Sequence, residues 1–486
     1  VLLVAALLVL LTEVTLSLGS RIWAVICAAA IALCLGFSVM QWLRADELGP
    51  QLAFTARDVP TVSNPMIVMD HFSAFAGLAL FVVAGLALIG AWRMIASLGT
   101  RGAELVGLFL LATAGLHLMA ISSNLVLLFI GLETASISLY VVAGFTRNQV
   151  RSDEAAMKYF LLGSFASAIF LYGVALTFAS TGSTTIYGVG GIAAFFAETV
   201  VLEPGMVLVA VGLTIVGMAF KVSAAPFHQW APDVYQGAPS AAVPLMAAGV
   251  KIAGFAALVR ILTAAFPTLL DDWAPAIAVM ATVSIVLGTL LAIAQRDMKR
   301  MLAYSGVAHA GFLITAMVGG DAGTPALWFY LATYAVQLVG AFTVVSIVSG
   351  PRADRSPFDA YQGLAARSPV LAAVLALFML ALGGFPLTAG FVGKLAVFSA
   401  AVDAGYLWLA IVAVVVAVAG LFFYLRVIVL MYFTEPVAAE APGTARATPQ
   451  PDAAGRVVLG VAAAVTLGLG LVPWPLLELV RVALPL

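Results

Sequence analysis

Long apolar runs, separated by short polar, glycine and proline breaks, make up most of the chain. A bilayer core about 30 Å thick needs about 20 apolar residues per helix, and these runs have that length. A β-barrel would instead show short segments of alternating polarity. The pattern therefore predicts an all-α polytopic membrane protein with about fourteen transmembrane helices. The predicted spans cover residues 1–18, 22–43, 66–92, 105–122, 125–145, 155–179, 206–234, 241–264, 273–294, 301–318, 326–348, 369–401, 407–433 and 457–472.

The composition agrees with a membrane protein. Of 486 residues, 63% are hydrophobic and 9% are charged, whereas a soluble domain carries about 25% charged residues. This excludes a secreted or cytosolic soluble enzyme. The net charge of −1 and the absence of a basic run argue against nucleic-acid binding. Cys27 and Cys34 are too few for an iron-sulfur cluster, and no His, Cys or carboxylate cluster has metal-ligand spacing.

Basic residues divide unevenly between the two sides of an alternating path through these spans, thirteen against four. By the positive-inside rule the richer side is cytoplasmic, which predicts an even number of spans and periplasmic termini. The run 1–18 reads as a retained first span, because no basic segment precedes it and no cleavage site follows it. Residues 434–456, rich in Ala, Pro and Thr, predict a flexible cytoplasmic linker. The richer side collects Arg21, Arg93, Arg101, Arg147, Arg151, Arg296, Lys299, Arg300, Arg352, Arg355, Arg367, Arg446 and Arg456; the other has Arg44, Arg57, Arg260 and Arg481.

Four of the five lysines fall inside predicted spans, where a central charge costs about 2.5 to 3.5 kcal/mol on insertion scales. The span 125–145 adds an acid, Glu133. Burial lowers the pKa of an amine and raises that of a carboxyl group, which brings both toward the range where they exchange protons. The alternative is that each lysine belongs to a structural ion pair. The four lysines are Lys158, Lys221, Lys251 and Lys394.

Two histidines lie near these lysines in sequence. His228 follows Lys221 in the segment Lys221-Val-Ser-Ala-Ala-Pro-Phe-His228, and His309 lies in the span 301–318. Each fits a neutral proton-relay residue. Each equally fits a hydrogen-bonded structural histidine, and the sequence leaves both interpretations open.

Two spans are too long for one straight helix. At 1.5 Å per residue, 206–234 and 369–401 would measure about 43 and 50 Å. Pro226 and the run Gly383-Gly384-Phe385-Pro386 predict a break in each. Backbone groups freed by such a break require a protein-lined or hydrated cavity, and Lys221 and Lys394 lie close to the two breaks in sequence.

The broken helices also suggest internal symmetry. Residues 104–264 and 273–433 each hold five predicted helices. A unit with an odd number of spans ends on the opposite side of the membrane from its start, so the second unit is inverted relative to the first, as in transporters built from inverted repeats. The predicted organisation is therefore a three-helix segment at 1–103, two inverted five-helix repeats each containing a broken helix, the linker 434–456, and a C-terminal helix within 457–486.

Six segments and one lysine carry a resemblance to a known family: residues 69–73, 129–133, 154–164, 220–239, 299–305 and 390–394, and Lys251. In these residues the chain resembles the antiporter-like membrane subunits of respiratory complex I, the bacterial proton-pumping NADH:quinone oxidoreductase. Lysine at position 394 resembles the N-type subunits, since M-type subunits typically carry glutamate there.

The resemblance implies that Glu133 and Lys221 form the functional centre, with Lys158 beside the glutamate, Lys251 connecting the repeats and Lys394 on the exit side. It implies a non-redox subunit of a proton translocase in the bacterial inner membrane, assembled with other membrane-arm subunits. This chain would hold no cofactor. NADH, flavin, iron-sulfur clusters and quinone would belong to partner subunits.

Two other functions remain open at this stage. A subunit of a multisubunit sodium/proton antiporter or of a membrane-bound hydrogenase would share the lysine and glutamate pattern. A sodium path would call for more intramembrane carboxylates than Glu133. A non-pumping scaffold of the membrane arm is the third reading, but a scaffold would gain stability if its buried charges were replaced by apolar residues.

Overall fold

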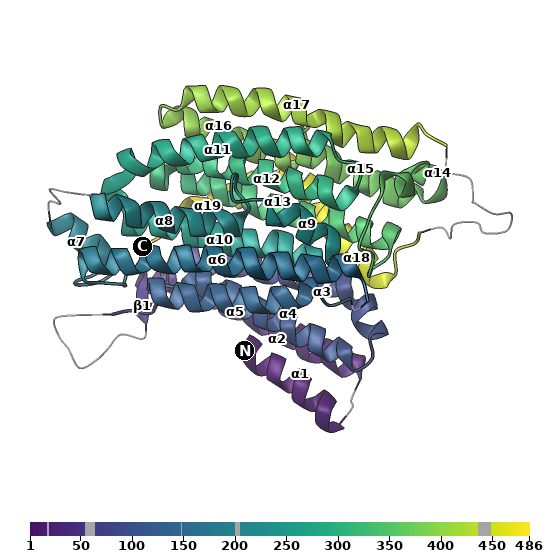
Figure 1. The fold of residues 1–486 in the computed structure, drawn as a ribbon, viewed down its shortest axis with the longest axis horizontal. Helices are drawn as coiled ribbons and strands as arrows, with labels where there is room; N and C mark the ends of the chain where they lie inside the picture. The colour runs from purple at the N-terminus through teal and green to yellow at the C-terminus, as the bar shows by residue number, and fades with distance from the viewer. Residues whose placement is uncertain (17–18, 54–63, 147, 200–204, 436–448) are drawn as a thin grey trace.

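The structure, a computed structural model, describes residues 1–16, 19–53, 64–146, 148–199, 205–435 and 449–486. Its long helices run nearly parallel and form one bundle (Figure 1). A small antiparallel hairpin pairs β1 (Gln51–Ala53) with β2 (Ile67–Met69). The helices are α1 (Leu2–Leu16), α2 (Ser20–Leu48), α3 (His71–Ser97), α4 (Arg101–Ile121), α5 (Leu125–Ala143), α6 (Val150–Thr181), α7 (Ile192–Glu198), α8 (Gly205–Val222), α9 (Trp230–Gly237), η1 (Leu245–Gly249), α10 (Val250–Val259), η2 (Arg260–Ala265), η3 (Pro267–Leu269), α11 (Leu270–Ile293), α12 (Met298–Met317), η4 (Gly320–Gly323), α13 (Thr324–Ser349), η5 (Phe358–Tyr361), α14 (Leu364–Arg367), α15 (Pro369–Gly383), α16 (Ala389–Asp403), α17 (Leu407–Tyr432), α18 (Ala453–Leu471) and α19 (Trp474–Val482).

Each predicted span coincides with a helix or, at 206–234 and 369–401, with two helices separated by a break. Eleven helices in the described part of the chain are long and apolar enough to cross a membrane, and α1 and α15 are shorter apolar helices. The all-α membrane class is confirmed, while the exact number of spans and the inverted repeats stay predictions. Most of the predicted linker, 436–448, lies outside the described residues.

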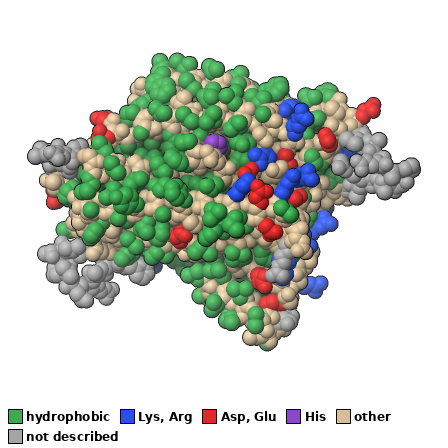
Figure 2. Space-filling model, viewed as in Figure 1, with side chains coloured by type: hydrophobic (Ala, Val, Ile, Leu, Met, Phe, Trp, Pro, Cys, Tyr) green, Lys and Arg blue, Asp and Glu red, His purple; other side chains and the backbone are tan. Residues whose placement is uncertain are grey.

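The structure differs from the sequence prediction at the C-terminus, where two helices, α18 and α19, replace the single helix expected. Pro473 follows α18 and interrupts the helical hydrogen bonds. The short helix α7, which the hydropathy pattern did not indicate, follows α6. Lysines, arginines and acids gather mainly at one end of the bundle, on the right in Figure 2, while the visible flank is largely apolar.

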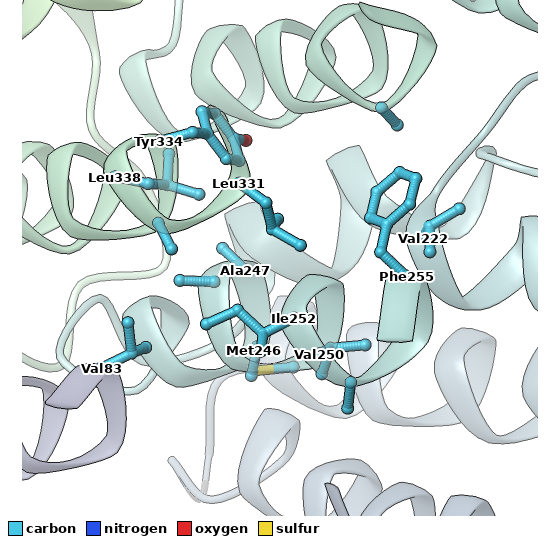
Figure 3. Packing of buried hydrophobic residues seen from close by; sticks show 14 of the residues in the cluster. Val83, Val222, Met246, Ala247, Val250, Ile252, Phe255, Leu331, Tyr334 and Leu338 are labelled. Atoms are coloured by element: carbon cyan, nitrogen blue, oxygen red, sulfur yellow. The ribbon is translucent and has the colours of Figure 1, made fainter. Parts of the chain in front are cut away.

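The segment from η1 through α10 to η2 lies in the middle of the bundle and is fully buried. Figure 3 shows its side chains, including Met246 and Ile252, packed with Leu331 and Leu338 of α13. Lipid is as apolar as these side chains, so close packing and interhelical hydrogen bonds, rather than expulsion of water, hold the helices together. Gly288 of α11 illustrates that packing, because a side chain there would collide with the backbone of α12 at Ala308.

A buried ion pair ties the start of α3 to η2. The Arg260 guanidinium donates to both carboxylate oxygens of Asp70, at 3.1 and 3.3 Å, and also to the hydroxyls of Tyr187 and Ser73. Burial by itself would raise the pKa of the Asp70 carboxyl, but Arg260 and the Ser73 hydrogen bonds hold that pKa below its ordinary value. The sequence analysis counted Arg260 among the four basic residues of the charge-poor side, and the structure shows that its side chain is 0% exposed and paired inside the bundle.

Candidate functional site

The first helix break lies between α8 and α9. Ser223 adopts a left-handed conformation (φ 60°), and Pro226 has no N–H to continue the helix. Two of the carbonyls freed at the end of α8 find side-chain donors. Lys251 Nζ of α10 donates to the Val222 carbonyl at 2.6 Å, and Trp230 Nε1 donates to the Phe220 carbonyl at 2.9 Å. The predicted break is confirmed, and a buried lysine satisfies it.

Lys221 is buried on the α5 side of the same break. Its Nζ donates to Ser136 Oγ at 2.5 Å and lies 5.9 Å from the ring centroids of both Tyr140 and Tyr159. Glu133 lies three residues before Ser136, on the same face of α5. Its Oε1 is buried without a hydrogen-bond partner among the described residues. The structure thus brings Glu133 close enough to Lys221 for the two charges to interact, while no direct ion pair joins them among the described residues.

The second break lies between α15 and α16. Gly384 ends α15 in a left-handed conformation (φ 83°), which favours glycine. Lys394 Nζ of α16 donates to the carbonyls of Leu382 and Gly383 at 3.0 and 2.9 Å, and lies 5.0 Å from the ring centroid of Phe312. By this contact Lys394 corresponds to Lys251, which binds a freed carbonyl at the first break, and not to Lys221, the lysine that lies near the first break in sequence.

His309 of α12 lies in a buried group of hydroxyls. Its Nδ1 is 2.6 Å from the Tyr330 hydroxyl, its Nε2 is 3.0 Å from the Tyr424 hydroxyl, and its ring stacks on Tyr334 with centroids 4.5 Å apart. The Tyr424 hydroxyl also bonds to Ser305 Oγ at 2.5 Å. Both ring nitrogens of His309 therefore face hydroxyl groups, on α13 and α17.

Lys251 reaches toward this histidine group along α12. A Cβ placed on Gly306, one turn before His309, would lie 3.7 Å from Lys251 Cε and 3.3 Å from the Tyr334 hydroxyl. The absence of a side chain at Gly306 leaves the space that the lysine and the tyrosine occupy. The structure thus gathers groups from five helices in the interior of the bundle: Glu133, Lys221, Lys251, His309 and Lys394.

Lys158 does not lie in that interior, and the prediction that it does is wrong. Its side chain is 41% exposed and forms ion pairs with Glu154 and Asp233, at 2.6 and 2.7 Å. Asp233 also accepts from Arg300 at 2.5 Å. α6 has one face toward the bundle and one outward, and Lys158 lies at its edge beside α9. A hydropathy pattern does not distinguish these faces.

Lys299, which the sequence analysis counted among the basic residues between the spans on the cytoplasmic side, lies inside helix α12 and is buried. Lys299 is 0% exposed, and its Nζ donates to the carbonyls of Ala238 and Ala353 at 2.7 and 2.8 Å. Asp297 caps α12 and so places Lys299 in the first helical turn. This capping signal is present in the sequence.

His228 lies within the first break, buried, with its ring 6.3 Å from that of Tyr304 in an edge-on arrangement. Among the described residues, no hydrogen bond joins it to the lysines, Glu133 or His309. Its assignment to the candidate site therefore remains a prediction.

Comparison with known proteins places this geometry in a family. The family described as "NADH:quinone oxidoreductase/Mrp antiporter, TM" matches residues 122–420. NADH-quinone oxidoreductase subunit N of Trichlorobacter lovleyi is 42% identical over 368 residues, which are 76% of this chain and 75% of the relative. The protein of the same name from Mycobacterium tuberculosis is 43% identical over 387 residues, 78% and 71% of the two chains.

Solved structures agree with these relatives. A chain of respiratory complex I from Thermus thermophilus with bound aureothin superposes with a TM-score of 0.79 at 33% identity, covering 98% of this chain and 97% of that one. A chain of the Mrp complex from Dietzia sp. DQ12-45-1b reaches a TM-score of 0.84 at 24% identity, covering 99% and 96%. The second likeness is one of fold alone.

Proposed function

Because the chain belongs to the family of NADH:quinone oxidoreductase and Mrp antiporter membrane subunits, we propose that it translocates protons as an N-type membrane subunit of a bacterial NADH:quinone oxidoreductase. The complex is the enzyme, and this chain is a non-redox subunit of its translocase. NADH, flavin, iron-sulfur clusters and quinone bind in partner subunits. Its own partners are the neighbouring membrane-arm subunits and the lipid of the inner membrane.

The observation that carries the proposal is a buried lysine on the freed carbonyls of each broken helix. An ammonium group has three N–H donors. After losing one proton the neutral amine still has two, which is enough for the two carbonyls that Lys394 contacts. Either lysine can therefore change protonation state in mid-membrane without leaving these carbonyls unpaired. A structural ion pair does not allow this, because loss of one charge exposes the other.

His309 suits the space between the two lysines. A proton can arrive at one ring nitrogen while another leaves the opposite nitrogen, and the hydroxyls of Tyr330 and Tyr424 stand at those two positions. We assign to the relay Glu133 and Lys221, then Lys251, His309 and Lys394. Water at the two breaks supplies the remaining hydrogen bonds, since irregular backbone in a membrane lines wet or protein-filled space.

Lys158 and its acidic partners mark the approach to this relay. The group formed by Lys158, Glu154, Asp233 and Arg300 is partly exposed, and charged side chains gather toward the same end of the bundle in Figure 2. We assign this end to the cytoplasm, with both termini toward the periplasm, from the charge asymmetry of the sequence. His228, in the break beside Tyr304, is assigned to the entrance of the relay.

Replacing Lys394 by Met tests the proposal in inside-out membrane vesicles that contain the whole complex. Methionine fills the volume of the lysine stem but donates no proton and no hydrogen bond. Proton pumping driven by NADH should fall strongly while the complex still assembles. The exposed Arg456→Gln variant serves as the matched loss of a positive charge. An unchanged number of protons pumped per NADH in Lys394→Met would contradict the relay.

A further inference from the structure

Two hollows of opposite character adjoin where α18 begins. The first is an apolar groove of about 440 Å³ between α2 and α3, with Ala454 of α18 at its end. The second is a polar cavity of about 610 Å³ between the last turns of α3 and α13 and the start of α18. Neighbouring residues of α3 line both, because Trp92 borders the groove and Arg93 the polar cavity.

The groove has the length of one lipid leaflet. On α2 its lining runs from Ala24 to Leu35, a rise of about 16 Å at 1.5 Å per residue. Half of a bilayer core is about 15 Å thick. Ala28 and Ala32, small and exposed, line it one turn apart on α2, and Gly85 lines it from α3. An acyl chain therefore fits along the groove from the membrane midplane to the head-group level.

The polar cavity carries one charge of each sign. Arg93 is exposed, and no hydrogen bond or ion pair engages it among the described residues. Asp452 is also exposed and uses Oδ1 to cap the Gly455 N–H. Hydroxyl groups complete the lining, from Ser97, Thr343, Ser346 and Ser349. Arg352, which does not line the cavity, donates to the Ser97 hydroxyl at 2.7 Å.

We propose that the groove and the polar cavity together bind a phospholipid whose head group carries a phosphate and a primary ammonium, as in phosphatidylethanolamine. The phosphate lies against Arg93, where charge-assisted hydrogen bonds are strongest. The ammonium faces Asp452 and the serine and threonine hydroxyls, which accept its N–H groups. A glycerol head group has no cation for Asp452, and a choline head group has no N–H to donate. The opposite charges of the cavity therefore select the ethanolamine lipid.

Photocrosslinking in membranes that contain the intact complex tests this site. Three probes carry the same diazirine-bearing acyl chain on an ethanolamine, glycerol or choline head group. The ethanolamine probe should label peptides of α2 and α3 most strongly. Arg93→Gln and Asp452→Asn should each reduce its labelling about fivefold, the factor that corresponds to about 1 kcal/mol per charged contact near a membrane surface. Asparagine keeps the cap of α18 while removing the charge.

Groove-filling variants separate a built site from ordinary lipid contact. Ala32→Phe should abolish labelling within the groove, whereas Ala29→Phe, exposed on the same helix but outside the groove lining, should leave it unchanged. Arg456→Gln, a lost charge at the same end of the bundle, should also leave it unchanged. Equal labelling by all three probes, a preference for the glycerol lipid, or a groove that is unlabelled because a partner subunit covers it would each overturn the proposal.

Discussion

The substitution Lys221→Met distinguishes a proton relay from a non-pumping scaffold. If Lys221 belongs to a relay, we expect the variant to lose proton pumping with little loss of stability. Lys221 donates one hydrogen bond, to Ser136 Oγ, and no carboxylate forms an ion pair with it among the described residues. Ser136 itself donates to the Leu132 carbonyl. After the substitution the serine hydroxyl therefore keeps a partner, and no direct ion pair among the described residues is broken.

The magnitude follows from these contacts. A hydrogen bond to a charged group contributes about 1.5 to 3 kcal/mol. Removing a buried cation also removes its desolvation penalty, which is several kcal/mol in proteins. Methionine packs well against the two aromatic rings that flank Lys221. These effects oppose each other, so we expect the free energy of unfolding to change by less than about 2 kcal/mol.

The assay measures assembly and pumping in the same vesicles. The complex should appear at its normal level on native gels, while NADH-driven proton uptake falls at least about tenfold, the effect of a barrier raised by about 1.4 kcal/mol. The Glu133→Gln complex should also assemble at its normal level and show reduced proton uptake, because the substitution removes the acid at the same site. The Ser136→Ala variant keeps both ionisable groups. Its rate of NADH-driven proton uptake should therefore lie between the rates of these two variants and that of the wild type.

Two outcomes would refute this reasoning. Wild-type pumping in an assembled Lys221→Met complex would show that no proton depends on this lysine. Loss of the assembled complex in proportion to the loss of pumping would show that Lys221 acts in stability, as a scaffold residue does.

The remaining predictions test other parts of the structure. Asp70→Asn should destabilise the protein by about 3 to 5 kcal/mol, because it leaves Arg260 buried without its charge partner, and thermal unfolding measures this. Since the pKa of Asp70 is held below its ordinary value, the wild-type pair should weaken only as the pH falls through that lowered pKa, and the variant should lose this acid dependence. Lys158→Met should reduce pumping less than Lys221→Met, because a partly exposed ion pair contributes about 0 to 1 kcal/mol. Cysteines at exposed Ala366, or at Gly443, which lies outside the described residues, should react with a membrane-impermeant reagent only from the cytoplasm; reaction only from the periplasm would invert the topology.

The sequence by itself determined the class of fold and the places where helices break. Runs of about 20 apolar residues can satisfy their backbone in a membrane only as helices, so hydropathy alone located them. Pro226 and Gly384 act on their own local backbone, and the breaks at these residues follow from covalent geometry. The sequence also showed that lysines and Glu133 lie where charge is costly, and this pointed to proton chemistry.

Only the tertiary structure decided which charged groups meet. It showed that Lys251 donates to the Val222 carbonyl and that His309 lies between two tyrosine hydroxyls. It also showed that Lys158 is partly exposed and that Lys299 is buried. The physical reason is that lipid and bundle interior are both apolar, so a membrane helix carries little amphipathic signal to separate its two faces. Burial and contact there depend on neighbouring helices that are distant in sequence, as the pairing of Arg260 with Asp70 demonstrates.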